Sequence, residues 1–340
     1  MLGHMNGKME QAVFAVAASL FALAACASQT VATSRDQPQP CGAKLDKVAK
    51  VASVSIAYRQ YGPRNGPPMV LLAGTGQQLV DWPPALIDAL TGKGYRVTVF
   101  DNRDIGCSTH TKEAGAPAFG EIIKAIGAGK LAPVAYTLET LADDTRGLMD
   151  ALGIHKAHIV GVSQGAIVAE MFAAKYADRT LSLSAIAPNS GNRAISVPAD
   201  PKRFAGLPPA PPESAPLDTI VAYKIANTKA LQSQTYPRSD AELRAFAVVD
   251  TERSYDPDAA ARQSAAALVT PDLRPRLKTI SAPTIVIQGD QDPLIPKAMA
   301  EEVASSIPRA RLVIIAGMGH DLPDAATPDL VAAIISVAHS

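Results

Sequence analysis

The chain has 340 residues with 32 basic and 32 acidic side chains, so its formal net charge is zero. Hydrophobic residues make up 47% and charged residues 19%, which suits a folded core and excludes a disordered chain. The balanced charge argues against nucleic acid as a partner, because phosphate binding needs a basic face. Three cysteines without a CxxC pair exclude a disulfide scaffold and a cysteine-based zinc or redox site. We therefore expect an enzyme for small molecules, with no metal or cofactor.

The N-terminal sequence has the pattern of an export signal. Residues 12–27 are apolar apart from one serine and follow Lys8, and such a run is too short to span a bilayer but matches a signal peptide. It ends in LAAC at 23–26, which resembles the lipobox of bacterial lipoproteins. That resemblance implies a cleaved signal peptide over 1–25, a lipid on Cys26 and a cell-envelope lipoprotein that faces the periplasm. An ordinary cleaved signal, giving a secreted or soluble periplasmic protein, and an uncleaved anchor are the alternatives.

Residues 26–43 are polar, aperiodic and contain prolines, which predicts a flexible tether between the anchor and a folded domain. An exported protein folds in an oxidising compartment, and Cys41 and Cys107 are the two cysteines that remain besides Cys26. A disulfide between Cys41 and Cys107 is therefore a hypothesis, which requires their Cα atoms to lie within about 7 Å.

Short apolar runs alternate with helical patterns along the rest of the chain. Several runs are continuous and β-branched, which is typical of strands buried on both faces of a parallel sheet. The predicted strands are 51–59, 69–72, 96–100, 157–162, 181–187, 284–288 and 312–315. The helical patterns between them include 84–90, 138–152 and 166–176. The alternation predicts an α/β fold with a mostly parallel, doubly wound sheet, whose ligands bind at the carboxyl ends of the strands.

Two segments interrupt this alternation. Residues 111–135 form an insertion of small residues with one short helical piece. Residues 190–280 begin rich in proline and continue with helical patterns at 217–231, 240–249 and 258–268. Because this segment lies between two predicted strands, we expect a helical cap inserted over the sheet. The core then consists of residues 44–189 and 281–340.

The strongest motif is GVSQG at 161–165, directly after one predicted strand and before a helix. Glycines on both sides of Ser163 permit a sharp turn that exposes the serine at the carboxyl edge of the sheet. The helix N-terminus there favours developing negative charge. Ser163 is therefore the predicted nucleophile.

A serine nucleophile needs a base. His320 follows the last predicted strand within Gly-Met-Gly-His and lies at the same sheet edge as Ser163. His110 also follows a strand at this edge and is the alternative base. His155 and His158 precede a strand, so we expect them at the opposite edge, on the surface.

The base needs a carboxylate to orient it. The loop GDQDPLIP at 289–296 offers two. Asp290 is expected to bond its own loop backbone, whereas Asp292 lies further into the loop and is the predicted acid. Asp101 and Asp104 follow an earlier strand and are expected to hold their loop through turns and an ion pair with Arg103.

Together these motifs resemble the α/β-hydrolase superfamily over residues 50–338, and are most similar to its aclacinomycin methyl esterase-like branch. The motifs are FDNRDIGCST at 100–109, YTLETLADDTRGLMDALGI at 136–154, HIVGVSQGA at 158–166 and APTIVIQGDQDPLIP at 282–296. The order Ser163, Asp292, His320 is that of the superfamily. The resemblance implies the fold and the catalytic triad, but the superfamily carries many reactions on one scaffold.

The resemblance also implies an oxyanion hole. In the family, a loop after the first parallel strand supplies one backbone N–H, and the residue after the nucleophile supplies the other. The corresponding loop reads Ala73-Gly74-Thr75-Gly76, with alanine where the family often has histidine. The implied donors are the N–H groups of Thr75 and Gln164, with Gly76 as the alternative to Thr75.

This site predicts a hydrolase for small or medium, largely uncharged carboxylic esters, which acts through an acyl-enzyme on Ser163. Its activity should rise through roughly pH 6–7 as the base loses its proton. An acyltransferase or a C–C bond hydrolase with the same triad is one alternative, and a non-catalytic binding lipoprotein of this fold is another. Candidates for lining the cap pocket, if they are not ordinary core residues, are Trp82, Phe204, Tyr223, Tyr255 and Met318.

Overall fold

The computed structural model describes Cys41 and residues 46–195 and 200–338. The predicted signal peptide at 1–25, Cys26 and the tether up to residue 40 lie outside the described residues. Among the helices that are described, none is long and apolar enough to cross a bilayer.

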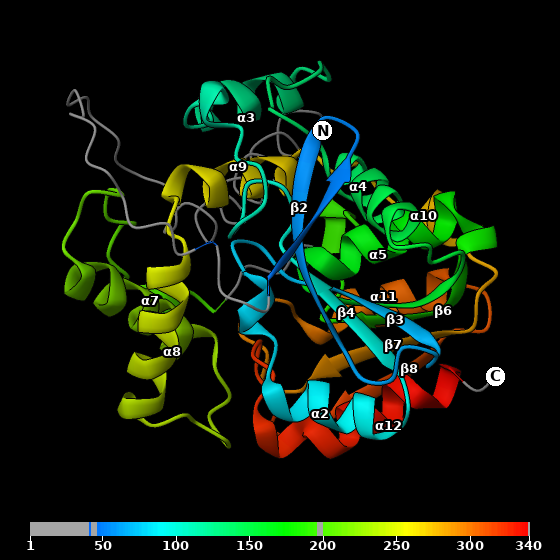
Figure 1. Cartoon of the computed structure of the whole chain (residues 1–340). Helices are drawn as coiled ribbons and strands as arrows, with labels where there is room; N and C mark the ends of the chain where they lie inside the picture. Colours follow the sequence, from blue (N-terminus) through cyan, green and yellow to red (C-terminus); the bar gives the residue numbers. More distant parts are fainter. Residues whose placement is uncertain (1–40, 42–45, 196–199, 339–340) are drawn as a thin grey trace.

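A single eight-stranded sheet organises the described part of the chain (Figure 1). Its strands are β1 (Lys47–Val51), β2 (Val54–Tyr61), β3 (Pro68–Leu72), β4 (Arg96–Phe100), β5 (Ala157–Val162), β6 (Thr180–Ile186), β7 (Thr284–Gly289) and β8 (Arg311–Ile315). They lie in the order β1-β2-β4-β3-β5-β6-β7-β8. The β1/β2 and β2/β4 pairs are antiparallel and all other neighbours are parallel. The predicted α/β class with a mostly parallel sheet is confirmed.

The first predicted strand, 51–59, corresponds mainly to β2, but a turn separates its first residue from the rest. β1 ends at Val51 and β2 begins at Val54, and Ala52 adopts the left-handed backbone conformation with φ 48°. A two-residue hairpin turn needs such a conformation, which normally favours Gly, Asn or Asp. Because the turn is made by Ala52 and Ser53, the sequence contains no turn signal within this apolar run.

Helices cover both faces of the sheet (Figure 1). One face carries α4 (Leu138–Ala151), α5 (Gln164–Lys175), α10 (Arg274–Leu277) and α11 (Lys297–Ser306), and the other carries α2 (Pro84–Gly92) and α12 (Thr327–Ala338). Each face encloses its own hydrophobic core. Leu141 and Phe172 belong to the first core, and Leu90 and Ile334 to the second. The two buried faces explain why the central strands read as continuous apolar runs.

The segment between β6 and β7 supplies the predicted cap helices. They are α6 (Pro201–Phe204), α7 (Leu217–Leu231), α8 (Asp240–Arg253) and α9 (Pro257–Leu268). α7 and α8 pack on each other beside the sheet (Figure 1). α9 packs against α3 (Phe119–Gly127), which is the helical piece of the other insertion. α10 was expected within the cap, but it contacts α5 and α11 and buries Leu277 in the main core.

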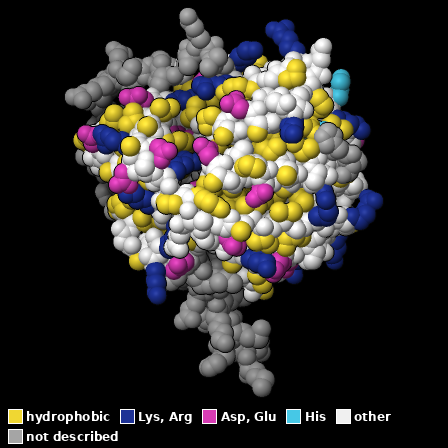
Figure 2. Space-filling model, turned by 90° about the horizontal axis from the view of Figure 1, so that it is seen from below, with side chains coloured by type: hydrophobic (Ala, Val, Ile, Leu, Met, Phe, Trp, Pro, Cys, Tyr) yellow, Lys and Arg dark blue, Asp and Glu magenta, His cyan; other side chains and the backbone are white. Residues whose placement is uncertain are grey.

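The surface carries charges of both signs. On the face that Figure 2 shows, Lys, Arg, Asp and Glu side chains are scattered among hydrophobic ones.

Candidate active site

Ser163 stands at the turn from β5 into α5. Its φ of 54° and ψ of −122° lie in a strained region, which is the geometry of a nucleophile turn. The backbone N–H of Ser163 donates to the carbonyl of Ile186 at 2.8 Å. A Cβ on Gly161 would lie 2.2 Å from the Gly165 carbonyl oxygen, and one on Gly165 would lie 2.1 Å from that of Leu72. The turn therefore requires both glycines of the motif.

His320 reaches Ser163 from the loop after β8. Its Nε2 lies 3.0 Å from Ser163 Oγ, which is hydrogen-bond distance for a base and its nucleophile. The backbone N–H of His320 donates to the carbonyl of Leu231, the last residue of α7, at 2.9 Å. The cap thus helps to fix the loop that carries the imidazole.

Asp292 completes the arrangement. Its Oδ2 lies 2.7 Å from His320 Nδ1, and its Oδ1 accepts the backbone N–H groups of Leu294 and Ile295 at 2.8 Å each. Asp290 was expected to bond its own loop, and this expectation was wrong. Its Oδ1 accepts the N–H of Gly317 at 2.7 Å, so Asp290 holds the β7 and β8 loops together. The structure therefore brings Ser163, His320 and Asp292 together, as expected from their places at the strand ends.

The ionisation of the pair follows from its surroundings. Burial disfavours the imidazolium, but the adjacent Asp292 carboxylate outweighs this effect and raises the pKa of His320 above its ordinary value. Burial opposes the charge on Asp292 as well, yet His320 and the two backbone N–H donors hold the pKa of Asp292 below its ordinary value. An ionised Asp292 can orient His320 and stabilise its protonated form during a reaction.

Two backbone N–H groups at the site have no hydrogen-bond partner among the described residues. We call residues 73–76, after β3, the oxyanion loop. Within it, Gly74 N–H donates to Gln77 Oε1 at 2.7 Å and Gly76 N–H donates to Gln263 Oε1 at 2.8 Å. Among the described residues, no hydrogen-bond partner is found for the N–H of Thr75 or of Gln164. Of the two alternatives in this loop, the Gly76 N–H is thus engaged and the Thr75 N–H is available.

The loop 101–110 is held by arginines in a way the sequence did not indicate. Asp101 Oδ2 lies 2.6 Å from Arg253 Nη2 in α8, and Asp104 Oδ2 lies 2.8 Å from Arg262 Nε in α9. The expected ion pair of these aspartates with Arg103 was wrong, because Arg103 pairs with Asp144 of α4. Two buried charge pairs therefore join this loop to the cap helices.

The other predicted residues occupy different places. His110 Nδ1 lies 2.8 Å from Asp256 Oδ2, so this histidine pairs with the cap rather than with Ser163. His158 was expected on the surface but is buried, with Nδ1 2.9 Å from Ser182 Oγ. The Sγ atoms of Cys41 and Cys107 form a disulfide, with Cα atoms 5.3 Å apart.

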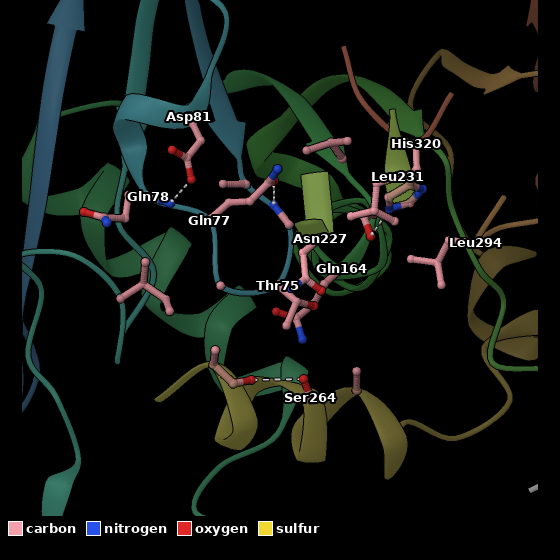
Figure 3. A pocket seen from close by; sticks show the side chains of 18 of the residues that line it. Thr75, Gln77, Gln78, Asp81, Gln164, Asn227, Leu231, Ser264, Leu294 and His320 are labelled. Atoms are coloured by element: carbon pink, nitrogen blue, oxygen red, sulfur yellow. Dashed lines mark hydrogen bonds between the residues drawn. The ribbon is translucent and has the colours of Figure 1, made fainter. Parts of the chain in front are cut away.

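A cavity of about 460 Å³ opens over the serine. Ser163, Thr75, Gln164 and His320 border it, together with residues from α7, α8 and α9. Figure 3 shows the labelled side chains of Thr75, Gln164, Asn227, Leu231 and His320 around this space. Its aromatic lining consists of Trp82, Phe204, Tyr223, Phe246 and Tyr255. Met318 does not line it but belongs to the core.

Sequence reasoning missed several residues that shape the site. Gln263 of α9 bonds the oxyanion loop, as described above. Ser233, after α7, donates its N–H to Asp321 Oδ1 at 2.9 Å and its hydroxyl to the carbonyl of Gly317. Gln77 bonds Gly74 within its own turn. Apart from Gln77, which lies beside the predicted loop, no local pattern in the sequence indicates these contacts.

Comparisons with known proteins identify the fold family. The family model described as alpha/beta hydrolase fold matches residues 67–324. The chain is 25% identical over 283 residues to a rhodomycin D methylesterase of Streptomyces peucetius, a match that covers 78% of this chain and 89% of that protein.

Solved structures give the same picture of the fold. A hydrolase from Pseudomonas aeruginosa PA01 matches with a TM-score of 0.64 and 25% identity, over 88% of this chain and all of that chain. The enol-lactonase from Burkholderia xenovorans LB400 matches with a TM-score of 0.62 and 24% identity, over 86% of this chain and 98% of that chain.

Proposed function

The chain belongs to the alpha/beta hydrolase fold family, and on this premise we propose that it is a serine hydrolase of small or medium, largely uncharged carboxylic esters. The observation that carries the proposal is the continuous contact Asp292–His320–Ser163 beside the free N–H groups of Thr75 and Gln164. This combination supplies a base, its orienting carboxylate, a nucleophile and two anion donors within one cavity.

In the proposed reaction, Ser163 Oγ attacks the ester carbonyl carbon while His320 Nε2 takes the hydroxyl proton. The carbonyl oxygen becomes an oxyanion and accepts the N–H groups of Thr75 and Gln164. When the C–O bond breaks, His320 returns the proton to the departing alcohol and leaves an acyl group on Ser163. Water, deprotonated by His320, then attacks the acyl carbon. The bond from this carbon to Ser163 Oγ breaks, His320 returns the proton to Oγ, and the carboxylic acid is released. Asp292 remains ionised throughout and stabilises the imidazolium.

The cavity supports the proposed substrate class. Its volume of about 460 Å³ lies in the range that holds small organic ligands, and five aromatic side chains line it. Two of its charged residues, Lys224 and Asp250, pair with each other and so offer less charge to a substrate. The relative from Streptomyces peucetius is named a methylesterase, which favours an ester with a small alcohol as the first substrate to test.

The test is a fluorophosphonate reaction read by intact mass, together with a panel of esters of varied chain length. We expect one adduct per chain, located on Ser163, and hydrolysis of neutral esters. In Ser163→Ala the adduct should be absent and turnover should fall by at least about 10⁴-fold, because the acyl-enzyme cannot form. Near-normal turnover in this variant would refute the proposal.

Parallel substrates separate the alternatives with the same triad. A 1,3-diketone tests for C–C bond hydrolysis, and added alcohols test for acyl transfer in place of hydrolysis. A protein that is not labelled and turns over no substrate would favour a binding role.

We further propose that the protein is exported and anchored in the cell envelope by a lipid on Cys26, facing the periplasm. The LAAC sequence at 23–26 supports this location, and a disulfide is typical of exported proteins. The test is incorporation of labelled palmitate, which Cys26→Ser should abolish. Wild-type protein that carries no lipid would contradict the anchor.

A further inference from the structure

The helix α9 of the cap reaches the proposed anion site through Gln263, whose side chain is fully buried. We infer that Gln263 is a positioning residue for the oxyanion hole, so that the cap sets the geometry of the two N–H donors. This inference rests on the proposed function and concerns how the same site is organised.

The first contact fixes the oxyanion loop. Gln263 Oε1 accepts the N–H of Gly76 at 2.8 Å, and Gln77 Oε1 accepts that of Gly74 at 2.7 Å. Glutamine side chains thus engage the N–H groups on both sides of Thr75, whereas the Thr75 N–H has no partner among the described residues. Gly76 has φ +70°, a backbone conformation that glycine adopts readily. The bond to Gln263 helps to maintain this conformation of the loop.

The second contact fixes the other donor residue. Gln164 Nε2 donates to the backbone carbonyl of Gln263 at 2.8 Å. One residue of α9 therefore touches both parts of the proposed oxyanion hole, the loop after β3 and the first residue of α5. A change in the position of Gln263 would move both donors relative to Ser163.

The amide of Gln263 has one orientation that satisfies its neighbours. Its Nε2 donates to the carbonyl of Arg103 at 3.4 Å, which directs Oε1 toward Gly76. The preceding residue, Arg262, pairs with buried Asp104, and the start of α9 is capped by Asp256, which accepts the Ala259 N–H. The helix is thus anchored at its start and at the residue directly before Gln263.

The expected consequence is specific to the transition state. A misplaced N–H donor weakens the bond to the oxyanion more than the contacts that bind the ester, because the ester carbonyl is not yet charged. Loss of the Gln263 amide should therefore lower kcat and leave KM nearly unchanged. Binding of a tetrahedral analogue should weaken together with kcat.

The experiment compares wild type, Gln263→Leu and Gln263→Glu with an ester from the panel and with phenylboronic acid, which forms a tetrahedral adduct on serine. Rates are expressed per active site by fluorophosphonate titration. For Gln263→Leu we expect kcat to fall by about 10- to 100-fold, KM to change by less than about 3-fold and the boronate inhibition constant to rise in parallel with the loss in kcat. Gln263→Glu keeps an acceptor for Gly76 and should retain more activity.

Two further variants keep the inference falsifiable. Gln164→Met removes the second contact but keeps the backbone N–H of residue 164, and it should also lower kcat more than it raises KM. This variant tests the inference independently if Gln263→Leu does not fold. Thr251→Val is the control. Among the described residues this buried hydroxyl bonds to the Ala247 carbonyl within α8 alone, so the variant should leave kcat unchanged.

An unchanged kcat per titrated site in Gln263→Leu, or a lower melting temperature as the only effect, would overturn the positioning role. Equal losses in the Leu and Glu variants would also overturn it. A wild-type protein that neither hydrolyses esters nor reacts at Ser163 would instead refute the proposed function itself, so the two failures are distinguishable.

Discussion

Gln263 and Gly76 lie 187 positions apart in the sequence, yet the side-chain oxygen of the first accepts the backbone N–H of the second. The loop after β3 and the inserted cap therefore meet directly at the candidate site. The His320 loop meets the cap as well, through the Leu231 carbonyl. The proposed catalytic groups belong to the sheet, but part of their support comes from the insertion.

The pH dependence of activity should follow His320. The base must be neutral to accept a proton, and Asp292 raises the pKa of His320 above the ordinary value of about 6.5. The kcat/KM of ester hydrolysis should therefore rise with pH, with its midpoint above about 6.5. A pH profile on a neutral ester measures this directly. A midpoint below 6.5 would contradict the assigned pair.

The two aspartates of the β7 loop should behave differently. Asp292→Asn removes the charge that stabilises the imidazolium and should lower kcat by about 10⁴-fold. Asp290→Asn keeps an oxygen that accepts the Gly317 N–H and should lower kcat by less than about 10-fold. Steady-state kinetics of both variants provide the comparison. A larger loss in the Asp290 variant would reverse the assignment of the acid.

The buried pair of Asp101 and Arg253 should matter for stability. Burial raises the pKa of Asp101 although Arg253 pairs with it. Arg253→Met leaves this carboxyl without its partner and should lower the free energy of unfolding by about 3–5 kcal/mol. Asp101→Asn combined with Arg253→Met should lower it by less.

Urea unfolding measures these changes. The exposed pair of Arg244 and Asp218 is the control, and Arg244→Met should cost no more than about 1 kcal/mol. Equal losses for the buried and the exposed pair would show that the Asp101–Arg253 contact contributes little.

The disulfide should stabilise the fold. It joins residues 66 positions apart. In the chain-entropy model, a cross-link that closes a loop of this length lowers the entropy of the unfolded chain and stabilises the fold by about 4 kcal/mol. Cys107→Ser should therefore lower the melting temperature, and reduction of the wild type should reproduce this change. Alkylation and mass spectrometry provide the check on the bond itself. Two alkylated thiols in unreduced protein would refute it.

Much of the candidate site was predictable because its residues directly follow strands that the local sequence indicates. Ser163, Asp292 and His320 each follow a recognisable strand, and the carboxyl ends of parallel strands meet at one edge. The turn residues around Ser163 are glycines with a clear steric purpose. The mostly parallel sheet was predictable for the same reason, from continuous β-branched runs.

The rest depends on contacts that no local pattern records. Arg253 and Arg262 lie on cap helices, and their pairing with Asp101 and Asp104 is decided by how the cap packs. The bond from Gln263 to Gly76 is of the same kind. The turn at Ala52 between β1 and β2 was not predicted, because alanine there adopts a left-handed backbone conformation that normally favours glycine.

The disulfide also has a geometric consequence for an anchored enzyme. Cys26 and Cys41 are 15 positions apart, so with Cys26 acylated as proposed the intervening chain extends to roughly 50 Å at most. Its far end is bonded to Cys107, in the same loop that contributes Gly106 and His110 to the cavity lining. The tether is thus attached beside the cavity rather than at a remote surface. An enzyme held in this way keeps its cavity within reach of esters that partition into the bilayer.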